Sequence, residues 1–147
     1  MTMHATETEA IRKTVTVPLP LEKAFRLFTD GAGSWWPVAS HSIEGDKVDD
    51  VVFDTDAKRV YERTPDGIEH DWADILAWEP PSGFLLGWRV DPNNAGTEVE
   101  VRFSPEGEGT RVELEHRGWE KCGPGERSSY DGGWEYVLGQ YETKAAD

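Results

Sequence analysis

The chain has 147 residues, of which 29 are acidic and 15 are basic, so its formal net charge is −14 at pH 7. This charge argues against binding to nucleic-acid backbones or anionic membrane surfaces, because both attract basic proteins. The length suits a single domain with one hydrophobic core, and no apolar run is long enough to span a bilayer.

The N-terminal residues and the single cysteine bear on where in the cell the protein is located. The first ten residues, MTMHATETEA, lack the basic and apolar regions of a secretory signal. Residues 1–9 are therefore expected to form a loose tail, and residues 10–147 the single domain. Cys122 has no second cysteine with which to form an internal disulfide. A cytoplasmic location is the simplest interpretation.

The front of the domain predicts a strand, two short helices and two further strands. Residues 11–17 alternate apolar and polar side chains, as in a strand with one buried face. Pro20 suits the first position of a helix that runs to Phe28, and residues 34–37 predict a second short helical turn. Residues 48–53 and 59–63 predict the next two strands.

Four strand-like runs between residues 67 and 119 predict an antiparallel sheet with one buried face. Turn signals at residues 80–83, 91–96 and 105–109 separate the runs. The outer face of the last two strands is mainly acidic, so like charges are expected to repel there. That face carries Glu98, Glu100, Arg102, Arg111, Glu113 and Glu115. The inner face is expected to carry Trp72, Leu76, Trp78, Phe84, Leu86, Trp88, Val99, Val101, Phe103, Val112, Leu114 and His116.

The C-terminal segment predicts the helix that covers this inner face. Residues 128–146 carry a helical apolar stripe made of Tyr130, Trp134, Val137, Leu138 and Tyr141. Three glycines, at positions 132, 133 and 139, each cost up to ~1 kcal/mol relative to alanine in a helix interior. They indicate that the helix passes close to another backbone, or to a molecule held between helix and sheet.

Several segments in this order resemble one known superfamily over nearly the whole chain. They are VPLP at 17–20 with Ala24-Phe25, WWP at 35–37, RVYER at 59–63, ILAWEPP at 75–81, TEVEV at 97–101, TRVEL at 110–114 and YDGGW at 130–134. With these segments the chain resembles the SRPBCC (START-like, helix-grip) superfamily, in the branch named for the activator of heat-shock protein 90 ATPase. One departure is Ala57-Lys58, where many relatives carry a glycine pair before the third strand.

The resemblance implies an α+β helix-grip fold. A curved antiparallel sheet of about seven strands would wrap round a long C-terminal helix, with two short helices after the first strand and a cavity between helix and sheet. It does not imply one activity, because relatives bind lipids, hormones or polyketides, transform substrates, or assist chaperones.

The candidate ligand contacts are aromatic and polar side chains expected on the inner face of the sheet and on the facing side of the helix. Trp72, Trp88 and Trp134 are expected to project into the same space, while His70 and His116 would offer polar contacts there. The expected cavity wall consists of Tyr61, His70, Trp72, Trp88, His116, Tyr130, Trp134 and Leu138.

No catalytic motif, phosphate loop or metal-ligand spacing occurs in the sequence. The interpretation is therefore non-catalytic binding of a small, mainly apolar or aromatic molecule, without cofactor or metal. One alternative is a cofactor-free cyclase, dehydratase or hydrolase that uses His70 or His116 with a carboxylate. Another is a co-chaperone-like interaction module that uses the acidic sheet face, although nothing in the sequence identifies a chaperone partner. The sequence also leaves a homodimer open.

Overall fold

The computed structural model describes residues 9–122 and 125–147, so most of the expected N-terminal tail lies outside the described residues. The order of elements is a strand, a short helix, six further strands and a long helix, interrupted by short 3-10 turns. Their bounds are β1 Ile11–Val17, α2 Leu21–Phe28, η1 Ala32–Ser34, η2 Gly45–Lys47, β2 Asp50–Asp54, β3 Arg59–Arg63, β4 Glu69–Glu79, β5 Gly83–Trp88, β6 Thr97–Glu106, β7 Gly109–Arg117, η3 Trp119–Lys121 and α3 Glu126–Ala145.

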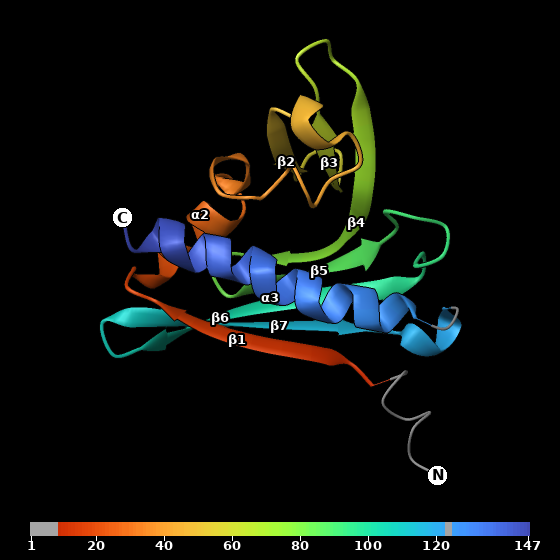
Figure 1. The fold of residues 1–147 in the computed structure, drawn as a ribbon. Helices are drawn as coiled ribbons and strands as arrows, with labels where there is room; N and C mark the ends of the chain where they lie inside the picture. The colour runs from red at the N-terminus through yellow and green to blue at the C-terminus, as the bar shows by residue number, and fades with distance from the viewer. Residues whose placement is uncertain (1–8, 123–124) are drawn as a thin grey trace.

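The seven strands form one antiparallel sheet in the order β1-β7-β6-β5-β4-β3-β2. The first strand of the chain therefore pairs with the last strand. The sheet curls, β4 bends strongly, and α3 lies across the concave side (Figure 1). This arrangement confirms the α+β helix-grip fold. None of the described helices is long and apolar enough to cross a membrane.

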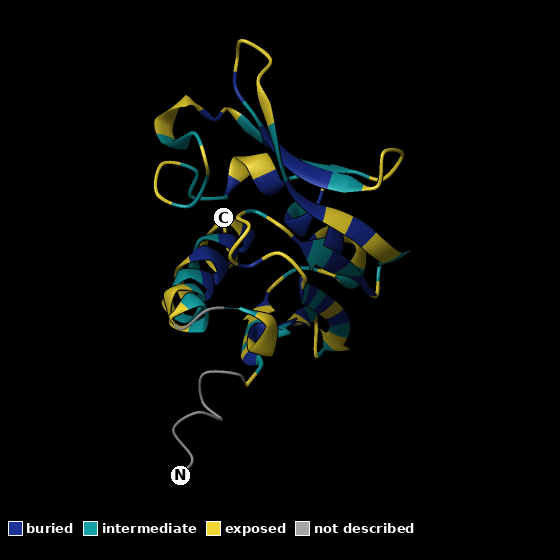
Figure 2. Ribbon diagram, turned by 90° about the vertical axis from the view of Figure 1, so that its right-hand side faces the viewer, coloured by how far each residue is buried: buried dark blue, intermediate teal, exposed yellow. Residues whose placement is uncertain are grey.

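The C-terminal half of α3 packs closely against α2 and the sheet. The Phe28 and Tyr141 rings meet edge to face with their centroids 5.0 Å apart, and the Tyr141 hydroxyl donates to the Ala24 carbonyl at 2.8 Å. Phe25 and Phe28 also contact Phe103 from the sheet. Figure 2 shows the buried residues along the facing sides of helix and sheet. Such edge-to-face aromatic contacts stabilise a core beyond simple area burial. Side chains therefore fill the space between the sheet and the C-terminal half of α3.

One residue of the expected inner face points the other way. Leu76 is 54% exposed, whereas its neighbour Ile75 is buried at 8%. The register between β4 and β5 shifts between Ile75 and Ala77. The pairing of β4 with β3 is also irregular, since Tyr61 pairs with Asp71 and Val60 with Ala73, so Trp72 and Ala73 are both buried and the alternation has already shifted before Leu76. The second irregularity, between Ile75 and Ala77, shifts it back, so Leu76 points outward while Trp78 packs against Phe25 on the inner face.

Three of the four glutamates expected on the outer face, Glu98, Glu100 and Glu115, are paired with arginines, which offsets part of the expected repulsion. Glu100 and Glu115 lie directly opposite each other on β6 and β7. Arg117 donates to Glu100 at 2.8 Å and to Glu115 at 3.2 Å, and it also reaches Glu98 at 3.2 Å. From the sequence, Arg102 and Arg111 were the only basic residues expected on this face. Further positive charge comes from Arg117, at the end of β7, and from Arg12 of β1, whose Nε lies 3.3 Å from Glu115 Oε1.

Candidate functional site

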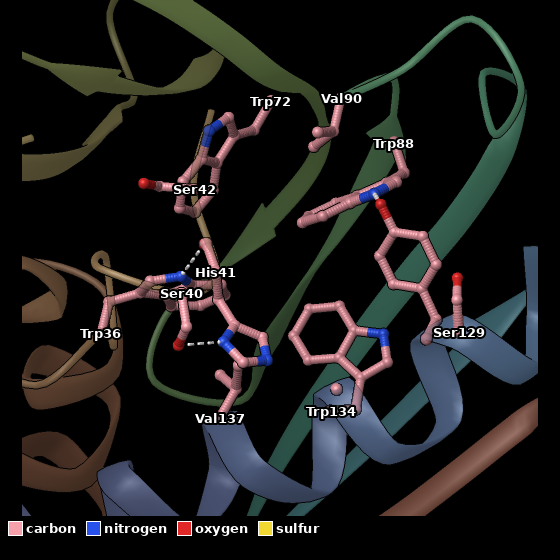
Figure 3. A pocket seen from close by; sticks show the side chains of 12 residues that line it. Trp36, Ser40, His41, Ser42, Trp72, Trp88, Val90, Ser129, Trp134 and Val137 are labelled. Atoms are coloured by element: carbon pink, nitrogen blue, oxygen red, sulfur yellow. Dashed lines mark hydrogen bonds between the residues drawn. The ribbon is translucent and has the colours of Figure 1, made fainter. Parts of the chain in front are cut away.

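A pocket of about 380 Å³ opens between the N-terminal half of α3, the sheet and the loop before η2 (Figure 3). Helix, sheet and loop each contribute part of its wall. The lining residues are Trp36, Ser40, His41, Ser42, Trp72, Trp88, Val90, Ser129, Tyr130, Gly133, Trp134 and Val137.

Four indole rings lie on the wall of the pocket. The Trp36 ring lies 4.9 Å from that of Trp72 and 6.0 Å from that of Trp134, centroid to centroid. The Trp88 ring completes the circle, 5.5 Å from Trp134 and 6.3 Å from Trp72. Flat apolar walls of this kind offer a large contact area to a planar molecule.

A second hollow of about 380 Å³ lies between α2 and the turn after β4. Its wall includes the charged residues Glu22, Arg26 and Asp30 beside Trp78. An apolar ligand would have to desolvate these charges, and this cost makes the aromatic pocket the better candidate.

His116 lies behind the aromatic wall and is fully buried. Trp134 Nε1 donates to its Nδ1 at 2.9 Å, so Nδ1 is unprotonated and the neutral ring carries its hydrogen on Nε2. That hydrogen is donated to Thr97 Oγ1 at 2.8 Å, and Thr97 in turn donates to the Asn94 carbonyl at 2.9 Å. Burial lowers the pKa of His116 to about 3. The ring is therefore a neutral support that fixes the Trp134 indole.

Glu62 performs a similar task on the opposite wall. This carboxylate is fully buried on β3 and accepts three hydrogen bonds. Trp72 Nε1 and the Ile43 amide donate to Oε1 at 2.7 Å each, and the Glu44 amide donates to Oε2 at 2.8 Å. Because backbone N–H groups are among the donors, the carboxylate holds both the Trp72 ring and the loop that carries Ser40, His41 and Ser42.

The loop reaches the pocket from the other side. Trp36 Nε1 donates to the His41 carbonyl at 2.8 Å, and Ser40 Oγ lies 2.7 Å from His41 Nδ1. The His41 ring stacks on Tyr136 of α3 with centroids 5.1 Å apart. A Cβ atom at Gly133 would lie 3.9 Å from the His41 ring. Gly133 thus faces the loop across the pocket, while a Cβ at Gly132 or Gly139 would meet no described atom within 4 Å. None of these three glycines is required by a close backbone contact.

The structure brings together four of the eight expected wall residues, namely Trp72, Trp88, Tyr130 and Trp134. The other four lie outside the wall. Tyr61 packs under the Arg59 guanidinium at 3.8 Å, and Leu138 is buried in the core. His70 Nε2 pairs with Glu44 Oε2 at 2.6 Å, away from the pocket.

Several wall residues were not among those expected from the sequence. Val90 continues the alternation that begins at Trp88, and Gly133 and Val137 share the helical spacing of Tyr130 and Trp134, so these three carried a readable signal. Ser40, His41 and Ser42 carried none, because they belong to a loop whose position depends on Glu62, about twenty residues further along the chain. Among the described residues, no group of three or more His, Cys, Asp or Glu is placed to hold a metal ion.

Comparison with known proteins places this geometry in context. Among solved structures, the chain is similar to an anthrahydroquino-γ-pyrone synthase, Txn09, with 32% identity, a TM-score of 0.58 and coverage of 90% of this chain and 88% of that one. It is also similar to CalC, a self-sacrificing resistance protein from Micromonospora echinospora, with 28% identity, a TM-score of 0.72 and coverage of 95% and 94%. The Aha1 dimer from Colwellia psychrerythraea, at 14% identity and a TM-score of 0.64 over 92% and 94% of the two chains, shows likeness of fold alone.

No curated protein sequence matches the chain at a significant level. A family model, however, matches residues 18–143, which include every described strand except β1 and most of α3. Its description is Activator of Hsp90 ATPase homolog 1-like protein. The chain therefore belongs to the family of Activator of Hsp90 ATPase homolog 1-like proteins.

Proposed function

We propose that the protein binds a small, flat, mainly apolar molecule in the pocket between α3 and the sheet. The observation that carries this proposal is the ring of four indoles around a space of about 380 Å³. That volume is within the usual range for small-molecule sites, which are lined mainly by apolar and aromatic side chains with a few polar groups. His116 and Glu62 support the proposal, because they hold two of the indoles in fixed orientations.

A cofactor-free enzyme of the same fold is the second candidate function. One relative at 32% identity is a synthase, and His41 is an imidazole on the pocket wall. The two histidines first considered for acid–base chemistry are less suitable. His116 has both ring nitrogens engaged, and His70 is paired with Glu44 outside the wall. Turnover that disappears in His41→Gln would favour the enzyme, whereas unchanged turnover would exclude His41 as its acid or base.

Gly133→Leu tests the binding proposal by filling the pocket from the helix. Only His41 lies within 4 Å of the added Cβ, so the larger side chain enters the space where a ligand would sit. We expect fluorene, a flat apolar probe, to bind the wild type and to bind this variant at least about tenfold more weakly, a loss of ~1.4 kcal/mol. Tryptophan fluorescence and calorimetric titration would measure both affinities.

Gly132→Leu is the matched control, since it makes the same change one residue away on the exposed side of α3. Both variants replace a helix-interior glycine, so each should gain roughly 0.5–1 kcal/mol of unfolding free energy from helix propensity. Fluorene affinity should change less than twofold in the control. Equal binding by the wild type and both variants, or no binding by the wild type, would refute the proposal.

A further inference from the structure

We propose that the Tyr130 hydroxyl is a pre-positioned hydrogen-bond donor for the ligand, and that the ligand is a flat aromatic compound with a carbonyl oxygen on its edge. This inference rests on the proposed function and deepens it. The four indoles account for the planar apolar body of the ligand but not for any polar group on it. Tyr130 lies on the pocket wall, on α3, and its ring centroid is 6.2 Å from that of Trp88 of the sheet.

The hydroxyl oxygen of Tyr130 already accepts two hydrogen bonds. Trp88 Nε1 donates to it at 3.1 Å and Asn94 Nδ2 donates at 2.8 Å. An indole N–H can only donate. The Asn94 amide is fixed as well, because its Oδ1 accepts the Asp91 backbone N–H at 3.2 Å and the residue is only 2% exposed. The nitrogen of this amide, and not its oxygen, therefore faces Tyr130.

Two donors on one hydroxyl oxygen fill both of its acceptor positions. The remaining capacity of the group is its own hydrogen, and no described residue accepts it in the structure. Burial raises the pKa of Tyr130, so the hydrogen is retained at neutral pH. Hydrogen bonds received by a hydroxyl also polarise its O–H bond and strengthen it as a donor.

The consequence for a ligand is a preference for an acceptor over a donor. A carbonyl oxygen placed against Tyr130 receives the free hydrogen, whereas an N–H at that point finds both acceptor positions taken. The surrounding indoles require that the rest of the molecule be flat and apolar. Together these contacts select an aromatic ketone over its hydrocarbon analogue.

The test compares fluorenone with fluorene, which have the same ring system with and without a carbonyl group. Affinities are measured for the wild type, for Tyr130→Phe and for Tyr136→Phe, in which a hydroxyl is removed from an exposed position on the same helix. We expect the fluorenone-to-fluorene affinity ratio to fall about three- to tenfold in Tyr130→Phe, as for one net hydrogen bond. The ratio should be unchanged in Tyr136→Phe.

The infrared carbonyl stretch of bound fluorenone supplies a readout that does not depend on affinity. It should lie below its frequency in an apolar solvent when bound to the wild type or Tyr136→Phe, and return toward that frequency in Tyr130→Phe. An unshifted stretch in the wild type, or an affinity ratio unaffected by Tyr130→Phe, would overturn this inference while fluorene binding still upheld the pocket. If neither probe binds the wild type, the proposed function fails and this inference fails with it.

Discussion

At the scale of single residues, His116 makes the stability of the protein depend on pH. Its pKa is about 3 in the folded protein and 6.5 when unperturbed, so between these values the unfolded chain binds a proton that the folded chain does not. The free energy of unfolding should therefore be highest above pH 6.5 and decrease as pH falls through this window, by up to ~1.4 kcal/mol per pH unit. Urea denaturation at pH 7.5, 6.0 and 5.0 would measure the slope.

His116→Gln isolates this contribution, because glutamine can still donate and accept hydrogen bonds but does not titrate. The variant should be less stable at pH 7.5, and its deficit relative to the wild type should narrow as pH falls. Parallel pH curves for the two proteins would contradict this, because they would show that His116 binds a proton as readily in the folded chain as in the unfolded one.

How far the site could be predicted also depends on single residues. Trp72, Trp88, Tyr130 and Trp134 were found because strand alternation and helical spacing are local patterns. His41 was missed, because its place on the wall requires Glu62 to accept the Ile43 and Glu44 amides across the fold. His116 showed the correct parity but the wrong role. Its partners Thr97 and Trp134 lie on the neighbouring strand and on the covering helix, but alternation and spacing do not show which of these side chains bond to each other.

At the scale of elements, the strands and the long helix followed from turn residues and periodicity, and the detailed shape of β4 did not. A bulge depends on pairing with a partner strand, so the exposure of Leu76 could not be read from β4 alone. The turn between β2 and β3 holds Ala57-Lys58, where the resemblance led us to expect a glycine pair. There Lys58 adopts φ 57°, the left-handed region that favours glycine.

Lys58→Gly should therefore stabilise the protein. A left-handed conformation costs a non-glycine residue about 1–2 kcal/mol, and the greater freedom of glycine in the unfolded chain offsets part of the gain. We expect a net increase of roughly 0.5 kcal/mol in the free energy of unfolding, measured by the urea midpoint. Ala57→Gly is the control, because position 57 has no positive φ and glycine there should lower stability instead. An increase in both variants would point away from relief of strain at Lys58.

At the scale of the whole molecule, the net charge of −14 should make stability depend on ionic strength. Exposed ion pairs contribute little individually, whereas self-repulsion acts over the whole surface. Raising NaCl from 0.01 M to 0.1 M shortens the screening length from about 30 Å to about 10 Å. The melting temperature of the wild type should therefore rise. Salt also weakens the local ion pairs, but we expect this loss to be smaller than the gain from screening the net repulsion.

Arg117 offsets part of this negative charge on the outer face of the sheet. Arg117→Gln removes the shared partner of three glutamates but leaves the Arg102 bond to Glu100 and the Arg12 pair with Glu115, so we expect a loss of about 0.5–1 kcal/mol at 0.01 M NaCl. Arg111→Gln changes the net charge equally but removes a side chain whose hydrogen bonds go to a single carboxylate, that of Glu106, and should cost less. Thermal unfolding at both salt concentrations would compare them. The Arg117→Gln deficit should shrink as salt rises, since screening relieves the exposed glutamates. A deficit equal to that of Arg111→Gln, or one unaffected by salt, would show that Arg117 does not act as the common partner of this face.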